Sequence, residues 1–182
     1  MPPSLNRSRP QPKLHDRIGV IQLSSAASFT QGFRRACGLF ATGVTVLTTR
    51  AADGTPHGIT VNSFCSLSLD PPLVMVAIAR DCTFLNHFES SSFFAVNILR
   101  EDQRDLSIRF AQLPEGRFTG VAWREAASGS PWIDETLALL DCKTVQVLDT
   151  GDHRVIIGEA LEVAMSEGRP LIFFRSEYTG LA

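Results

Sequence analysis

The stretch HGITVNSFCSLSLDPPLVMVAI, residues 57–78, has apolar runs on both sides of a polar corner. Ile59–Val61, Ser66–Leu69 and Leu73–Ile78 have the composition of strands, and the double proline after Asp70 ends the polar part. Between the runs lie hydroxyl and amide side chains, which can hydrogen-bond a planar polar molecule without adding charge. The stretch therefore predicts consecutive strands joined by a corner that is suited to binding.

The corner itself is Thr60-Val61-Asn62-Ser63, where polar residues interrupt the strand alternation. Asn62 offers both a donor and an acceptor, and backbone groups become free where a strand bends. A plain turn built on an Asn or Ser side chain gives the same pattern. Taken alone, these residues favour the plain turn over a ligand site.

Outward from the corner, the chain reads as many short strands with few helices. We expect a helix from Ser28, capped by Ser28 with Gln31 and stopped by Gly43. Further helices are expected at Thr83–Phe88, capped by Thr83, and at Glu101–Gln112, with a loop-rich region at 113–131. The remaining strands are expected at Val44–Thr49, Phe93–Leu99, Leu139–Leu148, Arg154–Ala164 and Leu171–Phe174. This pattern predicts a mainly β protein with an antiparallel barrel and a few short helices.

The N-terminal residues differ from the rest of the chain. Four prolines fall in the first twelve positions, so residues 1–27 are expected to form a flexible extension, with room for a short strand at Ile18–Leu23. Residues 28–182 are expected to form one domain, which is long enough to bury a core.

Composition and charge exclude several classes of protein. Seventeen basic and nineteen acidic residues give a net charge of −2, which argues against electrostatic binding of nucleic acid. No apolar run reaches the roughly 18 residues of a membrane helix, and the N-terminus lacks the apolar core of a secretory signal, so the cytoplasm is the expected location. The four cysteines form no zinc-binding pattern, and we expect no metal site. No dinucleotide or phosphate-loop motif is present.

A second polar element, Gly151-Asp152-His153, lies between two apolar strand runs. A tight hairpin with a surface histidine is common, and the alternative is a glycine turn that presents an imidazole over a pocket. Thr83 at a helix start, with Arg80 before it, is a candidate phosphate contact, and Arg117 is another. No nucleophile stands with a base, so triad chemistry has no support.

These motifs, in this order and spacing, resemble the short-chain flavin reductases, the small partners of two-component flavin monooxygenases. The resemblance spans about residues 29–181 and rests on the segments FATGVTVLT (40–48), Thr60–Pro72, FAVNIL (94–99), Arg117-Phe118, Trp123-Arg124 and Gly151-Asp152-His153. Cys65, Asp81 and the first 27 residues depart from the family pattern.

The resemblance implies a six-stranded antiparallel split β-barrel, the FMN-binding split barrel, which is usually a homodimer. It implies that the protein binds FMN or FAD, accepts hydride from NADH or NADPH and releases reduced flavin to a monooxygenase. By position, the flavin would be lined by Thr42, Gly43, Thr60, Val61, Asn62, Ser63 and Ser68, with Thr83 at its phosphate. The nicotinamide side would hold Gly151, Asp152, His153, Arg154 and Tyr178, with His153 as the catalytic candidate in a positioning role.

Two alternatives remain open at this point. One is a flavin-binding module that carries electrons or senses redox state without fast turnover of a nicotinamide nucleotide. The other is an enzyme like pyridoxamine-phosphate oxidase on the same barrel, although that class uses more Arg and Lys around its phosphate than residues 57–83 offer.

Overall fold

The computed structural model describes residues 25–181, and the chain divides into two compact units, residues 1–39 and 40–182. The described part of the first unit is the helix α1 (Ala26–Cys37) with its flanking residues. Ser25 caps this helix: its Oγ accepts from the Ser28 N–H at 3.2 Å, and the Ser25 N–H donates to Ser28 Oγ at 3.1 Å.

The prediction for this helix was wrong at both ends. Ser28 is the third helical residue of the capping box and not the cap itself. The predicted division into residues 1–27 and 28–182 stays a prediction. The helix ends at Cys37, where the Gly38 N–H donates to the Arg34 carbonyl at 2.9 Å, and Gly43 lies in a strand. The strand expected at Ile18–Leu23 lies outside the described residues.

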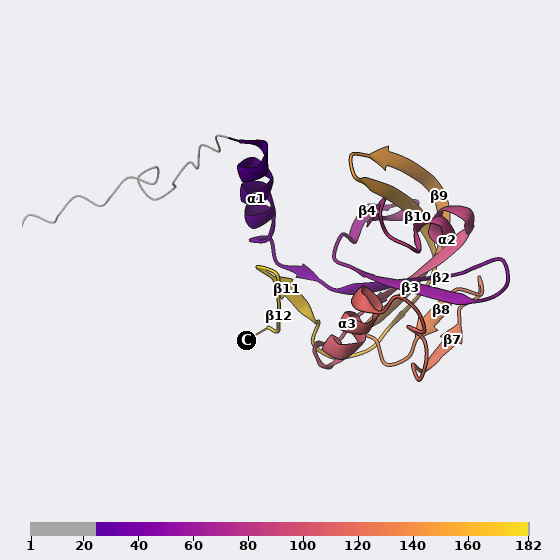
Figure 1. The fold of residues 1–182 in the computed structure, drawn as a ribbon. Coiled ribbons are helices and arrows are strands. Elements are labelled where there is room, and N and C mark those ends of the chain that lie inside the picture. Colours follow the sequence, from indigo (N-terminus) through magenta and orange to yellow (C-terminus); the bar gives the residue numbers. More distant parts are fainter. Residues whose placement is uncertain (1–24, 182) are drawn as a thin grey trace, which may run out of the picture. The chain divides into compact units, whose positions relative to one another are not determined.

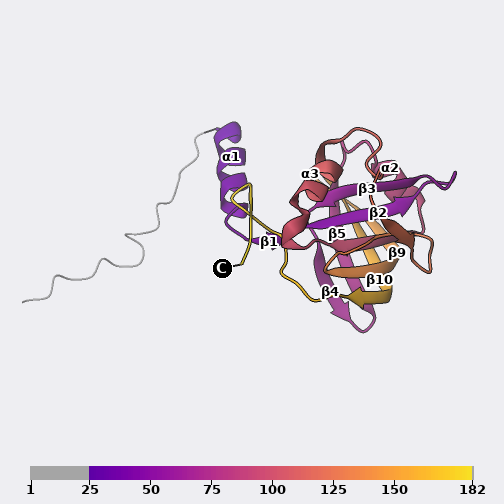
Figure 2. The same ribbon diagram turned by 90° about the horizontal axis from the view of Figure 1, so that it is seen from below.

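The second unit is built on one antiparallel sheet of seven strands (Figures 1 and 2). In spatial order these are β3 (Pro56–Val61), β2 (Thr45–Arg50), β6 (Phe93–Ile98), β9 (Ala138–Thr150), β10 (His153–Met165), β5 (Pro72–Ala79) and β4 (Cys65–Leu69). The sheet is not closed, because β3 and β4 are its edges within residues 25–181. The predicted mainly β fold, an antiparallel split barrel with few helices, is confirmed, although the sheet has seven strands and not the six that the resemblance implied.

Two small sheets complete the strands of this unit, and of their strands the sequence predicted only β11 (Ile172–Phe174), as Leu171–Phe174. β1 (Thr42–Gly43) pairs with β11, which pairs with β12 (Glu177–Thr179). β7 (Trp123–Glu125) lies inside the region expected to be loop, and it pairs with β8 (Pro131–Ile133), which begins at the last residue of that region. These strands have two or three residues each, too few to show a periodic pattern.

Three helical segments belong to this unit: α2 (Leu85–Ser90), the 3₁₀ turn η2 (Glu101–Gln103) and α3 (Arg104–Gln112). The prediction that Thr83 caps α2 was wrong. α2 follows Phe84 without a side-chain cap, and the Leu85 N–H bonds the Cys82 carbonyl at 3.1 Å, so Thr83 lies inside a turn. Among residues 25–181, no helix has the length and apolar character needed to cross a membrane.

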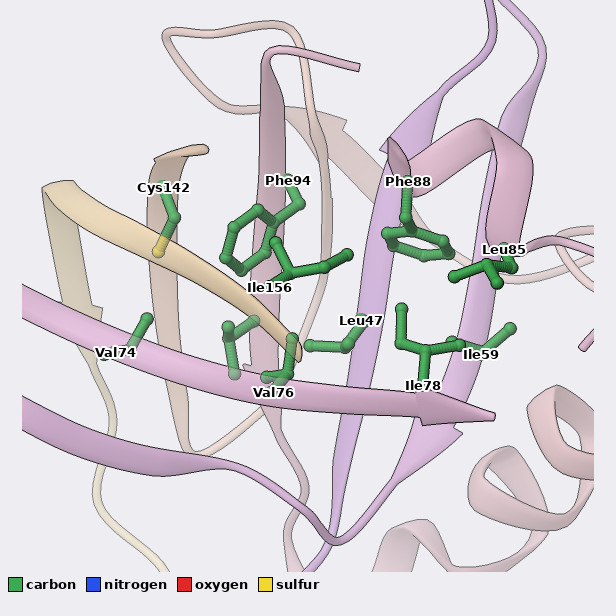
Figure 3. Packing of buried hydrophobic residues seen from close by; sticks show 11 residues of the cluster. Leu47, Ile59, Val74, Val76, Ile78, Leu85, Phe88, Phe94, Cys142 and Ile156 are labelled. Carbon is green, nitrogen blue, oxygen red and sulfur yellow. The ribbon is translucent and has the colours of Figure 1, made fainter. Parts of the chain in front are cut away.

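The main core lies inside the curled sheet (Figure 3). Leu47, Val76, Phe94 and Ile156 are almost fully buried there, with Phe88 from α2. Cys142 of β9 joins this cluster, and burial raises the pKa of its thiol to about 12.

Gly158 of β10 is required by this packing. A Cβ atom at Gly158 would lie 2.5 Å from Phe94 Cζ and 3.1 Å from Cys142 Cβ. The absence of a side chain therefore lets the Phe94 ring approach the strand.

Candidate functional site

A cavity of about 300 Å³ lies between β3, β5 and α3. It brings together the predicted corner Thr60–Ser63 and the predicted His153, which are far apart in the sequence. It is lined by Ile59, Thr60, Val61, Asn62, Ser63, Ala77, Ile78, Ala79, Cys82, Phe110, Ala111, Arg117 and His153. We call it the seam cavity, because it lies where the split barrel is open between β3 and β5.

The seam exists because β5 is only partly paired on one side. β10 pairs with β5 from Leu73 to Ala79, whereas β4 pairs only with Pro72–Met75. Beyond β4, the Ser63 hydroxyl donates to the Ala77 carbonyl at 2.7 Å and accepts from the Ala77 N–H at 2.9 Å. A single side chain thus takes both backbone groups that another strand would have paired.

The backbone groups of Ala79 lie on the same side of β5 as those of Ala77. Backbone groups two residues apart point to the same side of a strand, so those of Ala79 point to the seam, as those of Ala77 do. The Ala79 carbonyl accepts from the Cys82 N–H at 3.1 Å, whereas the Arg80 N–H points the other way and donates to the Asp152 carbonyl at 2.9 Å. The Ala79 N–H therefore faces the cavity that this residue lines.

One corner residue, Thr60, holds the fold together, whereas another, Asn62, has a side chain that can bind a ligand. Thr60 Oγ1 donates to the Ser107 carbonyl at 2.7 Å and so ties β3 to α3. Asn62 is exposed, and its side chain forms no hydrogen bond with any other residue of the described chain. The Asn62 amide, with one donor group and one acceptor, is thus free for a ligand in the seam cavity.

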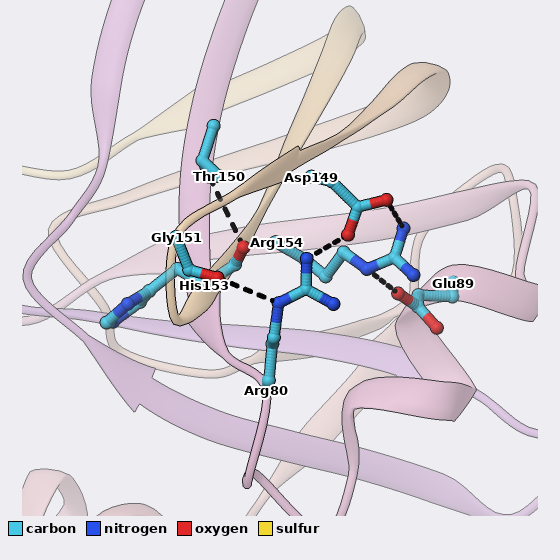
Figure 4. A network of polar contacts seen from close by, with 7 residues as sticks. All are labelled: Arg80, Glu89, Asp149, Thr150, Gly151, His153 and Arg154. Carbon is cyan, nitrogen blue, oxygen red and sulfur yellow. Dashed lines mark hydrogen bonds and ion pairs between the residues drawn. The ribbon is translucent and has the colours of Figure 1, made fainter.

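His153 lies in the hairpin between β9 and β10 (Figure 4). It is one of the residues that line the cavity. Gly151 has φ 55°, a conformation that glycine adopts without strain, and the predicted tight hairpin is confirmed. His153 Nδ1 lies 2.7 Å from a carboxylate oxygen of Asp152, which fixes one ring nitrogen. Gly151 and Asp152 shape the turn without lining the cavity.

The neighbouring arginines are held by carboxylates. Arg154 follows His153 and lies on the other face of the strand, where it pairs with Glu89 at 3.0 Å and Asp149 at 3.1 Å. Arg80, expected near a phosphate, pairs with Asp149 and donates to the Gly151 carbonyl at 3.0 Å.

Arg117 brings a positive charge to the cavity lining. Its Nη1 donates to the Gly58 carbonyl at 2.8 Å, and its guanidinium lies 4.3 Å from the centre of the Phe84 ring. Burial lowers the pKa of Arg117 from its ordinary value, but a guanidinium stays charged at neutral pH. Of the two arginines considered as phosphate contacts, Arg117 is the one at the cavity.

Next to Arg117 is a histidine pair that the sequence analysis did not identify. The His57 and His87 rings stack with centroids 3.9 Å apart and planes 7° apart, and Phe84 lies against both. Burial, and then the proximity of His87, lower the pKa of His57. No sequence signal joins two histidines that are thirty positions apart, since only the fold of β3 and α2 brings them together.

The other predicted site residues do not line the seam cavity. Thr42 and Gly43 lie in β1, Ser68 lies in β4, and Thr83 lies in the turn before α2. Tyr178 of β12 lines a separate cavity of about 360 Å³, and its hydroxyl is 2.9 Å from that of Ser107. The binding roles predicted for these residues stay predictions.

The open antiparallel barrel, with a cavity at its seam that is lined by apolar residues and a few polar groups, defines a split-barrel fold. The flavin reductase like domain family matches residues 37–182, and the chain belongs to this family of flavin oxidoreductases.

Relatives and a solved structure agree with this membership. The reductase component of a flavin-dependent trigonelline monooxygenase from Acinetobacter baylyi is 43% identical over 145 residues, 80% of this chain and 47% of that protein. The reductase subunit HsaB of a flavin-dependent monooxygenase from Mycobacterium tuberculosis is 43% identical over 152 residues, 82% of this chain and 81% of that protein. The FMN reductase (NADH) SmoA from Agrobacterium fabrum is 43% identical over 145 residues, 79% and 82% of the two chains.

Among solved structures, nitrilotriacetate monooxygenase component B from Mycobacterium thermoresistibile superposes with a TM-score of 0.82 at 41% identity, covering 87% of this chain and 89% of that one. The chain spans about half the length of the trigonelline relative and about four fifths of HsaB and SmoA.

Proposed function

We propose that this protein is an NAD(P)H-dependent flavin reductase that supplies reduced FMN or FAD to a separate monooxygenase. The observation that carries the proposal is the seam cavity, where Asn62 and the Ala79 N–H face the same space as His153. The names of the trigonelline, HsaB and SmoA relatives support the reaction and the partner.

The available groups of the cavity fit a flavin. An isoalloxazine edge alternates donors and acceptors, and the Asn62 amide with the Ala79 N–H offers matching groups without charge. Apolar side chains that are not fully buried, Val61 of β3 and Ala111 of α3, line the same space and can contact the ring. Arg117 supplies a positive charge for a flavin phosphate.

The hydride chemistry belongs to the nicotinamide and the flavin when they are bound. The task of the chain is to hold the two rings in a reactive arrangement and to exclude water between them. Asn62 orients the flavin ring, and His153 of the hairpin orients the nicotinamide. Neither residue needs to exchange a proton with the reacting atoms.

The test is the oxidation of NADH and of NADPH by the purified protein, with and without added FMN or FAD. We expect free flavin to accelerate the oxidation strongly, and the ratio of kcat/KM for each pair to identify the preferred flavin and nucleotide. Normal flavin binding without accelerated oxidation of either nucleotide would contradict the proposal and would favour an electron carrier or sensor.

The assembly we propose is a homodimer. Leu69 at the edge strand and Val163 and Met165 at the end of β10 are 95%, 60% and 84% exposed, which gives the sheet an apolar surface that a second copy can cover. Sedimentation should give twice the mass of the chain at micromolar concentration, and a monomer would contradict this. A cytoplasmic location stays a prediction from the sequence.

A further inference from the structure

We propose that Asp149 is a positioning residue for the reductase reaction: by holding Arg80 and Arg154, it fixes the hairpin turn that presents His153 to the seam cavity. The inference rests on the proposed role of His153 at the nicotinamide. Asp149 itself is not among the residues that line the cavity, so it would act only through the turn.

The Asp149 carboxylate lies at the end of β9 and uses both of its oxygens (Figure 4). Oδ1 accepts from Nη2 of Arg80, and Oδ2 is 3.1 Å from Nη1 of Arg154. One carboxylate therefore joins an arginine that follows β5 to an arginine within β10.

Arg80 forms two hydrogen bonds with the turn. Its backbone N–H donates to the Asp152 carbonyl at 2.9 Å, and its Nε donates to the Gly151 carbonyl at 3.0 Å. The Nε contact depends on where the guanidinium lies, and Asp149 is the carboxylate that pairs with it. Without this carboxylate, the guanidinium loses the ion pair that helps to keep it at the Gly151 carbonyl.

Arg154 secures the other side of the hairpin. Its Nε is 3.0 Å from Glu89 Oε1 of α2, so Arg154 keeps one carboxylate when Asp149 is replaced. Replacing Asp149 should therefore loosen the Arg80 side while the Arg154 side stays anchored. Such an asymmetric change tilts the turn without detaching it, and His153 tilts with it.

Loss of the Asp149 carboxylate should affect the reaction rate more than the stability of the fold. The side chains of Asp149 and Arg80 are 60% and 41% exposed, and exposed ion pairs contribute only about 0–1 kcal/mol to folding. The fold should therefore survive the loss of the carboxylate. Reaction rates, in contrast, depend on displacements of about 1 Å in the residues that orient a substrate.

The test is a double-mutant cycle between Asp149→Asn and His153→Ala. We expect Asp149→Asn to raise the KM for NADH by about three- to ten-fold while leaving the flavin dissociation constant unchanged. In the His153→Ala background, Asp149→Asn should have no further effect, because both changes act through the same imidazole. Asp149→Glu, which keeps a carboxylate, should restore most of the loss.

A matched control is Glu125→Gln. Glu125 of β7 is 57% exposed and pairs with Arg50 of β2 at 2.7 Å. The substitution therefore removes a comparable surface ion pair that involves no residue of the hairpin. Its kinetic constants should equal those of the wild type, and all variants should unfold at similar urea concentrations.

The outcomes distinguish the proposed role of His153 from the positioning role of Asp149. If His153→Ala leaves the KM for NADH unchanged, the proposed role of His153 fails, and with it this inference. If His153→Ala raises that KM, but Asp149→Asn is silent or adds to it independently, the positioning role alone is wrong. Equal loss of flavin and NADH binding in Asp149→Asn, or an equal effect of Glu125→Gln, would also overturn it.

Discussion

The Ser63 hydroxyl hydrogen-bonds both backbone groups of Ala77, at 2.7 Å to the carbonyl and 2.9 Å to the N–H. A strand pair normally satisfies such groups through a second backbone. Here a single side chain does so instead. The corner that contains Ser63 lines the seam cavity. The residue that the sequence suggested as a flavin contact therefore has a structural task as well.

Ser63→Ala should destabilise the protein by on the order of 1–3 kcal/mol, because both backbone groups of Ala77 lose their partner in a half-buried place. Urea unfolding measures this. Ser90→Ala is the control, since Ser90 is an exposed residue at the end of α2 and its hydroxyl bonds only the Asn86 and His87 carbonyls. Equal stability of the two variants would show that water replaces the Ser63 hydroxyl without cost.

Asn62→Ala should weaken flavin binding by on the order of 1–3 kcal/mol while leaving the unfolding midpoint near that of the wild type. The reason is that the amide lines the cavity but bonds no described residue of the chain. Fluorescence titration with FMN and FAD measures the affinity. Asn86→Ala, at an exposed position of α2, should leave it unchanged. An unaltered flavin dissociation constant in Asn62→Ala would mean that Asn62 only shapes the turn.

The pH dependence of stability should report the His57–His87 stack. The pKa of His57 is lowered from 6.5, so the unfolded chain binds a proton more readily than the folded protein does. Stability should therefore fall as the pH drops below about 6.5 and should stop falling below the pKa of the folded state. Asp53 opposes this shift, whereas His87 and Arg117 contribute to it.

His57→Phe isolates this contribution, because it keeps a ring against His87 and removes the proton site. Urea unfolding at pH values from about 5 to about 8 should show a weaker loss of stability in acid for the variant than for the wild type. Identical pH profiles would show that the stack tolerates the charged ring.

Gly158→Ala should destabilise the core by on the order of 1–3 kcal/mol, because its Cβ would meet the Phe94 ring at 2.5 Å. Adding Phe94→Leu should recover part of this loss by making space. Gly43→Ala is the control, since nothing lies within 4 Å of a Cβ atom at that position. The prediction fails if Gly158→Ala unfolds at the same urea concentration as Gly43→Ala.

The sequence predicted the parts of the fold that depend on local pattern. Alternating apolar residues identified most strands of the large sheet, and the glycine at 151 identified the hairpin, because both signals lie within a few neighbouring residues. The predictions of the helix caps were wrong because they, too, used only neighbouring residues. Ser25, Ser28 and Thr83 all have side chains that suit a cap, and the sequence does not show which of them the backbone will use.

The candidate site was predictable only in part. The corner Thr60–Ser63 and His153 do share one cavity, and a resemblance across the whole domain suggested that they would. The network of Arg80 with Asp149 and the stack of His57 on His87 depend on contacts between distant segments. Such contacts leave no periodic trace in a single chain, so only the structure could reveal them.

The burial of Cys142 has a consequence for thiol chemistry. With a pKa of about 12, its thiol is almost entirely protonated at neutral pH and therefore a very weak nucleophile, whereas Cys37 and Cys65 are exposed. An alkylating reagent should modify the exposed thiols first and reach Cys142 only when the sheet opens. With the two exposed cysteines and half-buried Cys82 replaced by serine, the alkylation rate of Cys142 would measure how often the main core opens to water.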